Sequence, residues 1–192
     1  MNPRTLLIVL AACSGDAAPQ AGKPRVDAVA AAKVEPRKIE GFCERHDGPE
    51  AAKPFVYPPM DTPAPGASPN WRWINVWATW CGPCIAEMPS LLKWSEKLAA
   101  AGQPVDLTFV SVDDSADIVK RWKVKHPELA VGDLRIQSAG ATGSWLQQLG
   151  LDAATAIPLH VFVDPQNRIR CVRSGAIDPG DFDIVKAVLA GQ

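Results

Sequence analysis

The spacing of hydrophobic residues changes several times between residue 71 and the C-terminus. Residues 71–78 and 105–112 are apolar runs rich in aromatic and β-branched side chains, which predicts two strands. Residues 83–101 repeat apolar side chains at helical spacing, which predicts a helix. Helices are also expected over three later segments, residues 114–125, 138–150 and 178–190. Strands that alternate with helices are typical of crossover units, so part of the sheet should be parallel.

Two more strands are expected near the C-terminus, over residues 158–163 and 169–173. They are separated by the sequence DPQN at residues 164–167, which is rich in turn-forming residues. A hairpin of this kind adds antiparallel strands to the parallel ones. The pattern therefore predicts an α/β fold with a mixed sheet.

The N-terminal residues show none of this periodicity. Residues 1–4 are positively charged, residues 5–12 are apolar, and small residues lead into Cys13, which is the order of an export signal. The sequence LAAC at residues 10–13 resembles a bacterial lipobox, in which the signal is cut before the cysteine and the thiol carries lipid. The alternatives are a plain secretory signal and a chance apolar start on a cytosolic protein. No later stretch has enough consecutive apolar residues to span a bilayer.

The segment after Cys13 is rich in Ala, Pro, Gly and Lys as far as residue 40, and it cannot offset its ordering entropy by burial. We therefore expect a signal peptide in residues 1–12, a lipidated cysteine and flexible tether in residues 13–40, and one folded domain in residues 41–192. This organisation predicts a periplasmic protein that is anchored to a membrane by lipidated Cys13.

Composition excludes several classes of protein. Of the 192 residues, 47% are hydrophobic and 21% are charged, which suits one globular domain and excludes wholesale disorder or a coiled coil. The formal net charge is −1, so there is no electrostatic reason to expect a nucleic-acid partner. No flavin or nicotinamide fingerprint such as GxGxxG is present, and no cofactor is expected. The chemistry should therefore come from the side chains.

The motif that carries chemistry is Trp80-Cys81-Gly82-Pro83-Cys84, at the junction of the first long strand and its helix. Unpaired N–H groups and the helix dipole stabilise a thiolate at a helix N-terminus, so Cys81 is expected to be the nucleophile. Cys84 lies one turn into the helix and is expected to be the buried, resolving thiol. It would attack the mixed disulfide on Cys81 and release the reduced partner.

The sequence VWATWCGPC at residues 76–84, with Glu87, Pro89 and a later Ile157-Pro158, resembles the thioredoxin fold. Within that fold it is similar to the TlpA-like thiol-disulfide reductases of the bacterial envelope. The resemblance covers residues 55–191. It implies a thioredoxin fold with a central mixed β-sheet flanked by helices on both faces.

The resemblance also implies roles for single residues. The Ile157-Pro158 bond should be cis and lie beside the cysteines, where the backbone can pair with an extended substrate. The implied substrate groove consists of Trp80, Gly82, Pro83 and Ile157.

The resolving cysteine must give its proton to an acceptor, such as the carboxylate of a buried acidic residue. Asn75 occupies the place of a buried acid in thioredoxin, and an amide cannot take up that proton. Glu87 lies on roughly the same side of the helix as Cys84, and the resemblance implies that it is the proton acceptor. A solvated helix glutamate is the alternative interpretation.

The residues between the two cysteines bear on the direction of the reaction. The dipeptide Gly82-Pro83 lacks the histidine that strongly oxidising relatives place between the cysteines, so a reductant is favoured. Its partners would be protein substrates with disulfides or thiols and a membrane electron donor of the thiol-disulfide relay type. The family resemblance implies substrates such as apocytochrome c or a copper-site protein. One alternative is a disulfide oxidase or isomerase. Another is a copper-binding metallochaperone that uses Cys81, Cys84 and either Met88 or His160.

The other cysteines of the folded domain are Cys43 and Cys171, which we expect to form a structural disulfide in an oxidising compartment. Two buried free thiols or a redox role are the alternatives. Cys43 and His46 have the spacing of metal ligands, but no second pair follows and no metal site is expected. His160 is interpreted as a core or surface histidine, with a modest role in tuning the cysteine site as the alternative.

Overall fold

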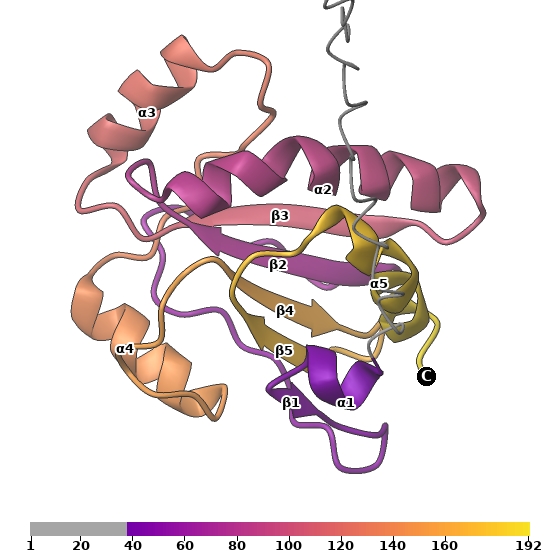
Figure 1. The fold of residues 1–192 in the computed structure, drawn as a ribbon. Helices are drawn as coiled ribbons and strands as arrows, with labels where there is room; N and C mark the ends of the chain where they lie inside the picture. Colours follow the sequence, from indigo (N-terminus) through magenta and orange to yellow (C-terminus); the bar gives the residue numbers. More distant parts are fainter. Residues whose placement is uncertain (1–37) are drawn as a thin grey trace, which may run out of the picture. The chain divides into compact units, whose positions relative to one another are not determined.

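A computed structural model describes residues 38–192, so the predicted signal peptide, Cys13 and most of the tether lie outside the described residues. A short helix begins at Ile39, within the last residues of the predicted tether. The elements follow one another along the chain as shown in Figure 1: α1 (Ile39–Phe42), β1 (Arg45–His46), β2 (Trp71–Trp77), α2 (Gly82–Ala100), β3 (Val105–Ser111), α3 (Ala116–Lys125), α4 (Ala139–Gln148), β4 (Leu159–Val163), β5 (Ile169–Ser174), η1 (Pro179–Asp181) and α5 (Phe182–Leu189).

The strands form one mixed sheet in the order β1-β5-β4-β2-β3. Strands β2 and β3 are parallel and are connected through α2, whereas β4 is antiparallel to β2 and β5 is antiparallel to β4. The hairpin at residues 164–167 therefore turns β4 into β5 as the sequence indicates. The prediction of a mixed sheet is confirmed.

Side chains alternate between the two faces of the sheet along each strand, so apolar residues point to both sides. Helices cover both faces and bury these residues. Trp73 and Trp77 of β2 belong to a core cluster that includes buried residues of α1, α2, α3 and α5. Ile74 and Val76 point the other way and pack in a second cluster with residues of α4. Figure 1 shows α4 separated from α2 by the sheet. The α/β thioredoxin fold with helices on both faces is confirmed.

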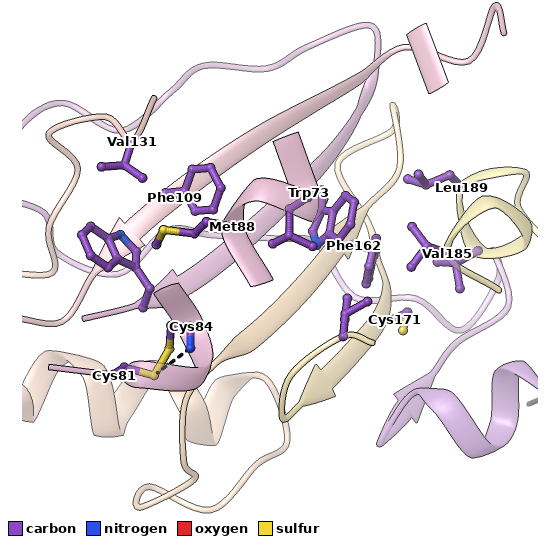
Figure 2. Packing of buried hydrophobic residues seen from close by; sticks show 14 of the residues in the cluster. Trp73, Cys81, Cys84, Met88, Phe109, Val131, Phe162, Cys171, Val185 and Leu189 are labelled. Carbon is purple, nitrogen blue, oxygen red and sulfur yellow. Dashed lines mark hydrogen bonds between the residues drawn. A yellow bond between two sulfur atoms is a disulfide. The ribbon is translucent and has the colours of Figure 1, made fainter. Parts of the chain in front are cut away.

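The first cluster connects the N-terminal half of α2 to α5. Figure 2 shows Met88 of α2 in this cluster with Phe109, Trp73 and Phe162, and it shows Val185 of α5 further along the sheet. The rings of Trp73 and Phe162 stack at a centroid distance of 5.1 Å. Burial of these large side chains fixes the register of α2 on β2, and thereby the position of the residues at the α2 N-terminus.

The sequence did not predict α1 or β1, which are too short to show periodicity. Strand β1 pairs antiparallel with β5, where His46 lies opposite Cys171. The segment that follows β1 continues across the domain by two isolated bridges, Pro54 with Arg168 and Met60 with Ile136. None of the helices in residues 38–192 is long and apolar enough to cross a membrane.

Candidate functional site

The two motif cysteines lie where β2 gives way to α2. Cys81 is the N-cap residue of α2, Pro83 lies in the first turn, and Cys84 follows within the helix. The sulfur atoms of Cys81 and Cys84 form a disulfide of 2.05 Å, with the Cα atoms 5.3 Å apart. The backbone N–H of Cys84 donates to Sγ of Cys81 at 3.3 Å (Figure 2). This N–H group and the helix dipole would stabilise negative charge on Cys81 after reduction.

The loop that leads into the motif is held by a residue that sequence reasoning missed. Asp113, just beyond β3, accepts from the backbone N–H of Thr79 at 3.0 Å and from the Thr79 hydroxyl at 2.7 Å. Its side chain also accepts from the Ser111 hydroxyl at 2.8 Å. Asp113 is buried, so these bonds fix the loop rigidly against the end of β3. Its position directly after an apolar strand was the available signal.

The two sulfur atoms differ in their access to solvent and to the neighbouring loop. Cys84 is fully buried, whereas Cys81 is 5% exposed and its Sγ lies 3.9 Å from the carbonyl oxygen of Ile157. The peptide bond between Ile157 and Pro158 is cis. Cys81 therefore lies beside the cis-proline loop, at the edge of the protein surface.

Trp80 and Ile157, two of the four residues implied to form the substrate groove, line one groove of about 490 Å³. Trp80 is 70% exposed, so its indole projects from the surface next to Cys81. The other two residues of the implied groove lie elsewhere around the motif. Pro83 instead lines a separate hollow of about 220 Å³ that also contacts Glu87, and Gly82 is the exposed first residue of α2.

The far wall of the groove was not anticipated from the sequence. It is made by Ala139, Thr142 and Leu146 of α4 and by residues 153–156, which precede the cis bond. Most of these side chains are small and apolar, and the acidic residue in the lining is Asp114. The loop around α4 thus adds an apolar surface next to Trp80.

Glu87 is buried beneath the motif, so the alternative of a solvated helix glutamate is wrong. Its Oε1 accepts from Nδ2 of Asn75 at 2.8 Å, and its Oε2 accepts from the backbone N–H of Ile177 at 2.8 Å. Only 5% of the residue is exposed, and this exposed edge lines the 220 Å³ hollow. Two donors thus hold a carboxylate below the cysteines, on the helix that carries Cys84.

His160 is a core residue and belongs to the same polar group. It lies opposite Asn75 in the pairing of β4 with β2, and it is fully buried. Its Nε2 is 3.3 Å from Oε1 of Glu87, and its Nδ1 accepts from the indole N–H of Trp73 at 3.2 Å. Sequence spacing could not place His160 next to Glu87, because the contact depends on which strands are neighbours.

The remaining cysteines form a second disulfide. Cys43, the C-cap of α1, is bonded to Cys171 of β5 with an S–S distance of 2.02 Å. Figure 2 shows Cys171 near Val185 and away from Cys81 and Cys84. The bond leaves Cys43 unavailable for a metal site with His46. In the part of the chain that the structure describes, no three His, Cys, Asp or Glu residues gather to hold a metal.

Comparison with known proteins agrees with this geometry. The family model Redoxin matches residues 72–189, more than half of the chain. Thioredoxin from Coprinus comatus is 40% identical over 52 residues, which cover 27% of this chain and 47% of that protein. Nucleoredoxin from Bos taurus is 32% identical over 102 residues, or 53% of this chain and 22% of that protein. The chain thus spans less than half the length of each of these curated relatives.

Solved structures show the same fold. A thioredoxin-related protein from Neisseria meningitidis serogroup B superposes with a TM-score of 0.54 and 26% identity, over 68% of this chain and 94% of that one. The thioredoxin domain of a thiol-disulfide oxidoreductase from Bacteroides vulgatus gives a TM-score of 0.50 at 17% identity, over 63% and 80% of the two chains, which is a likeness of fold alone. The chain belongs to the Redoxin family and has the thioredoxin fold.

Proposed function

We propose that the protein is mainly a reductant of protein disulfides, with Cys81 as the nucleophile. The Cys81 thiolate attacks one sulfur of a substrate disulfide, so that a mixed disulfide forms and the other substrate sulfur leaves as a thiolate. Support comes from the position of Cys81 at the N-cap of α2, where an N–H group points at its sulfur. Its small exposed edge lies next to Trp80 and Ile157, which line the groove, and a substrate disulfide would reach it there.

Cys84 then resolves the mixed disulfide. Its sulfur attacks Sγ of Cys81, the second substrate sulfur leaves as a thiol, and the Cys81–Cys84 disulfide forms. Overall, two electrons and two protons pass from the dithiol to the substrate. Cys84 is fully buried, so its proton needs an acceptor inside the protein, and Glu87 is the buried carboxylate on the same helix. The hollow beside Glu87 gives that proton a short path to solvent.

The substrate is proposed to bind as an extended segment along the groove between Trp80 and Ile157. The backbone around Pro158 would pair with this segment and present its disulfide to Cys81. The small apolar side chains on the α4 side of the groove suit an aliphatic substrate residue next to the reacting cysteine. Suitable substrates include the cysteines of apocytochrome c or of a copper-site protein.

The proposed location is the periplasm, with a lipid on Cys13 as the membrane anchor and residues 13–40 as the tether. The pairing of Cys43 with Cys171 as a disulfide agrees with an oxidising compartment. A reductant there must be reduced again after each turnover. We assign that step to a membrane electron donor of the thiol-disulfide relay type, which would reduce the Cys81–Cys84 disulfide by the reverse exchange.

The observation that carries this proposal is the difference between the two cysteines. Cys81 is the helix N-cap, keeps a small exposed edge and lies against the cis-proline loop, whereas Cys84 is fully buried. The test uses a reduced Cys84→Ser variant and a disulfide-containing peptide. We expect a stable mixed disulfide on Cys81, detected by mass spectrometry. The matched Cys81→Ser variant should trap none, and trapping on Cys84 in that variant at a similar rate would contradict the assignment.

A further inference from the structure

His160 is a fully buried imidazole in the middle of the sheet. A buried polar ring is costly unless its nitrogen atoms find partners. Two groups of β2 face Nδ1: the indole Nε1 of Trp73 at 3.2 Å and Nδ2 of Asn75 at 3.3 Å. The side chain is therefore held by β2 on one edge of the ring.

The partners of Nδ1 determine the tautomer. An indole N–H can only donate, so Nδ1 of His160 must accept and cannot carry a proton. The amide of Asn75 also turns an N–H donor toward Nδ1. Its Nδ2 donates to the carboxylate of Glu87, which can only accept, and this contact fixes which end of the amide faces the ring. In the neutral ring the proton of His160 therefore lies on Nε2.

This Nε2–H group faces Glu87. Nε2 lies 3.3 Å from Oε1, but the two are not aligned as a hydrogen bond, and within residues 38–192 Nε2 has no hydrogen-bond partner. A buried donor without a partner beside a carboxylate gains a charge-assisted bond from a small rotation of either side chain. His160 is thus poised to donate to Oε1 when the Glu87 carboxylate moves.

The two oxygen atoms of Glu87 consequently differ. Oε1 faces two N–H donors, Nδ2 of Asn75 and Nε2 of His160, so a proton on this oxygen would point at donors. Oε2 has one donor, the N–H of Ile177, and both Glu87 and Ile177 line the 220 Å³ hollow. Oε2 is therefore the oxygen that can take up a proton and pass it to solvent.

We propose that His160 is a positioning residue that keeps Oε1 of Glu87 an acceptor and directs the proton of Cys84 to Oε2. This inference rests on the proposed role of Glu87. In the resolving step the S–H bond of Cys84 breaks, an O–H bond forms on Oε2, and the sulfur electron pair attacks Sγ of Cys81. The substrate sulfur leaves with the electrons of the mixed disulfide and takes up a proton.

The kinetic test separates the two steps of a single turnover. Reduced protein is mixed with a disulfide peptide, quenched in acid, and the mixed disulfide on Cys81 is followed by mass spectrometry. We expect His160→Leu to slow decay of the mixed disulfide roughly tenfold, because Oε1 of Glu87 then faces one N–H donor instead of two and competes with Oε2 for the proton. Formation of the mixed disulfide should stay within about twofold of the original protein, since His160 takes no part in the first attack.

Two further variants exclude a merely structural effect. His160→Gln retains a side-chain N–H donor and should restore most of the decay rate. In a Glu87→Gln background, His160→Leu should cause no additional slowing, because both residues act through the same carboxylate. Equal slowing in both backgrounds, no rescue by His160→Gln, or no effect of His160→Leu would each overturn the role of His160.

Failure of the proposed function gives a different result. If Glu87→Gln alone leaves decay of the mixed disulfide unchanged, Glu87 is not the proton acceptor, and both proposals fall. If Glu87→Gln slows the decay and the His160 variants do not, only the present inference falls. A direct check is the nitrogen NMR spectrum of the His160 ring: we expect the neutral form with its proton on Nε2, and a proton on Nδ1 would overturn the argument.

Discussion

At the scale of single residues, the site combines a thiol at a helix N-cap, which keeps a small exposed edge, with a carboxyl group buried beneath it. Cys81 receives an N–H group from the first turn of α2, while Cys84 and Glu87 lie below it on the same helix. Asn75 links the parts, because its amide donates to Glu87 and faces Nδ1 of His160. An amide at this position supplies donors to the carboxylate where an acid would repel it.

The first prediction concerns that amide. Asn75→Asp places a second buried carboxylate within hydrogen-bond distance of Glu87, so two like charges compete for one site. We expect the free energy of unfolding at pH 7 to fall by roughly 2–4 kcal/mol. The loss should shrink in mild acid, where one carboxyl group can stay protonated. Urea unfolding at both pH values measures the change.

Asn70→Asp is the matched control for this variant. The amide of Asn70 also donates to a carboxylate, Asp106 at 3.0 Å, but the pair is half-exposed. Solvent screens such a pair, so its loss should stay below about 1 kcal/mol. Equal losses in the two variants would contradict the account of a buried, donor-filled site around Glu87.

The residues that sequence analysis could predict are those whose chemistry depends on local spacing. Cys81, Cys84 and Glu87 lie within one helix start, so their mutual placement follows from the helix alone. The contacts that His160 and Asp113 make in the site could not be predicted, since these residues reach it only after β4 and β3 pair on either side of β2. Contacts between distant segments are set by strand order, which the hydrophobic pattern does not contain.

At the scale of elements, β2 and α2 form the support of the site. Strand β2 is buried on both faces, and α2 packs on it through residues such as Met88 and Leu91. Long segments of this kind, with a clear period, were predicted to within a few residues of their observed ends. The short elements α1 and β1 were missed, because two to four residues carry no periodic signal and depend on tertiary contacts.

The second prediction concerns those short elements. The disulfide between Cys43 and Cys171 joins α1 and β1 to β5 across a sequence separation of 128 residues. Replacing both cysteines by Ala should lower the free energy of unfolding by about 2–5 kcal/mol, measured by urea denaturation without reductant, so that the Cys81–Cys84 pair stays oxidised in both proteins.

Disulfide reduction by the folded variant should remain near its original rate, because the bond lies away from Cys81. A parallel loss of activity in the folded variant would show that the second disulfide takes part in the reaction. An unchanged unfolding midpoint would show that the bond does not stabilise the domain.

At the scale of the whole molecule, the proposed tether would determine where the proposed reductant acts. Cys13 precedes a long stretch without periodicity, and the thioredoxin-fold domain follows it. A protein held at a membrane in this way would meet both its electron donor and its substrates close to the bilayer. The folded domain holds the reactive cysteines, and the N-terminal residues would hold it at the membrane.

The third prediction tests that anchor in the full-length protein. Cys13→Ser should abolish incorporation of labelled lipid and move the protein from the membrane fraction to the soluble fraction of the cell envelope. Cys43→Ser, which removes a cysteine from the folded domain, is the control and should leave lipid labelling unchanged. Membrane association that persists without Cys13 would contradict a lipid anchor at this residue.

The central claim is that the Cys81–Cys84 pair serves mainly as a reductant, and its reduction potential tests this most directly. The domain is equilibrated with defined ratios of reduced and oxidised glutathione or dithiothreitol, and the fraction of free thiol is measured, with Cys81→Ser as the control. We predict a value near that of thioredoxin, ~−270 mV. A value near that of strong oxidants, ~−120 mV, would contradict the assignment and indicate a disulfide oxidase or isomerase.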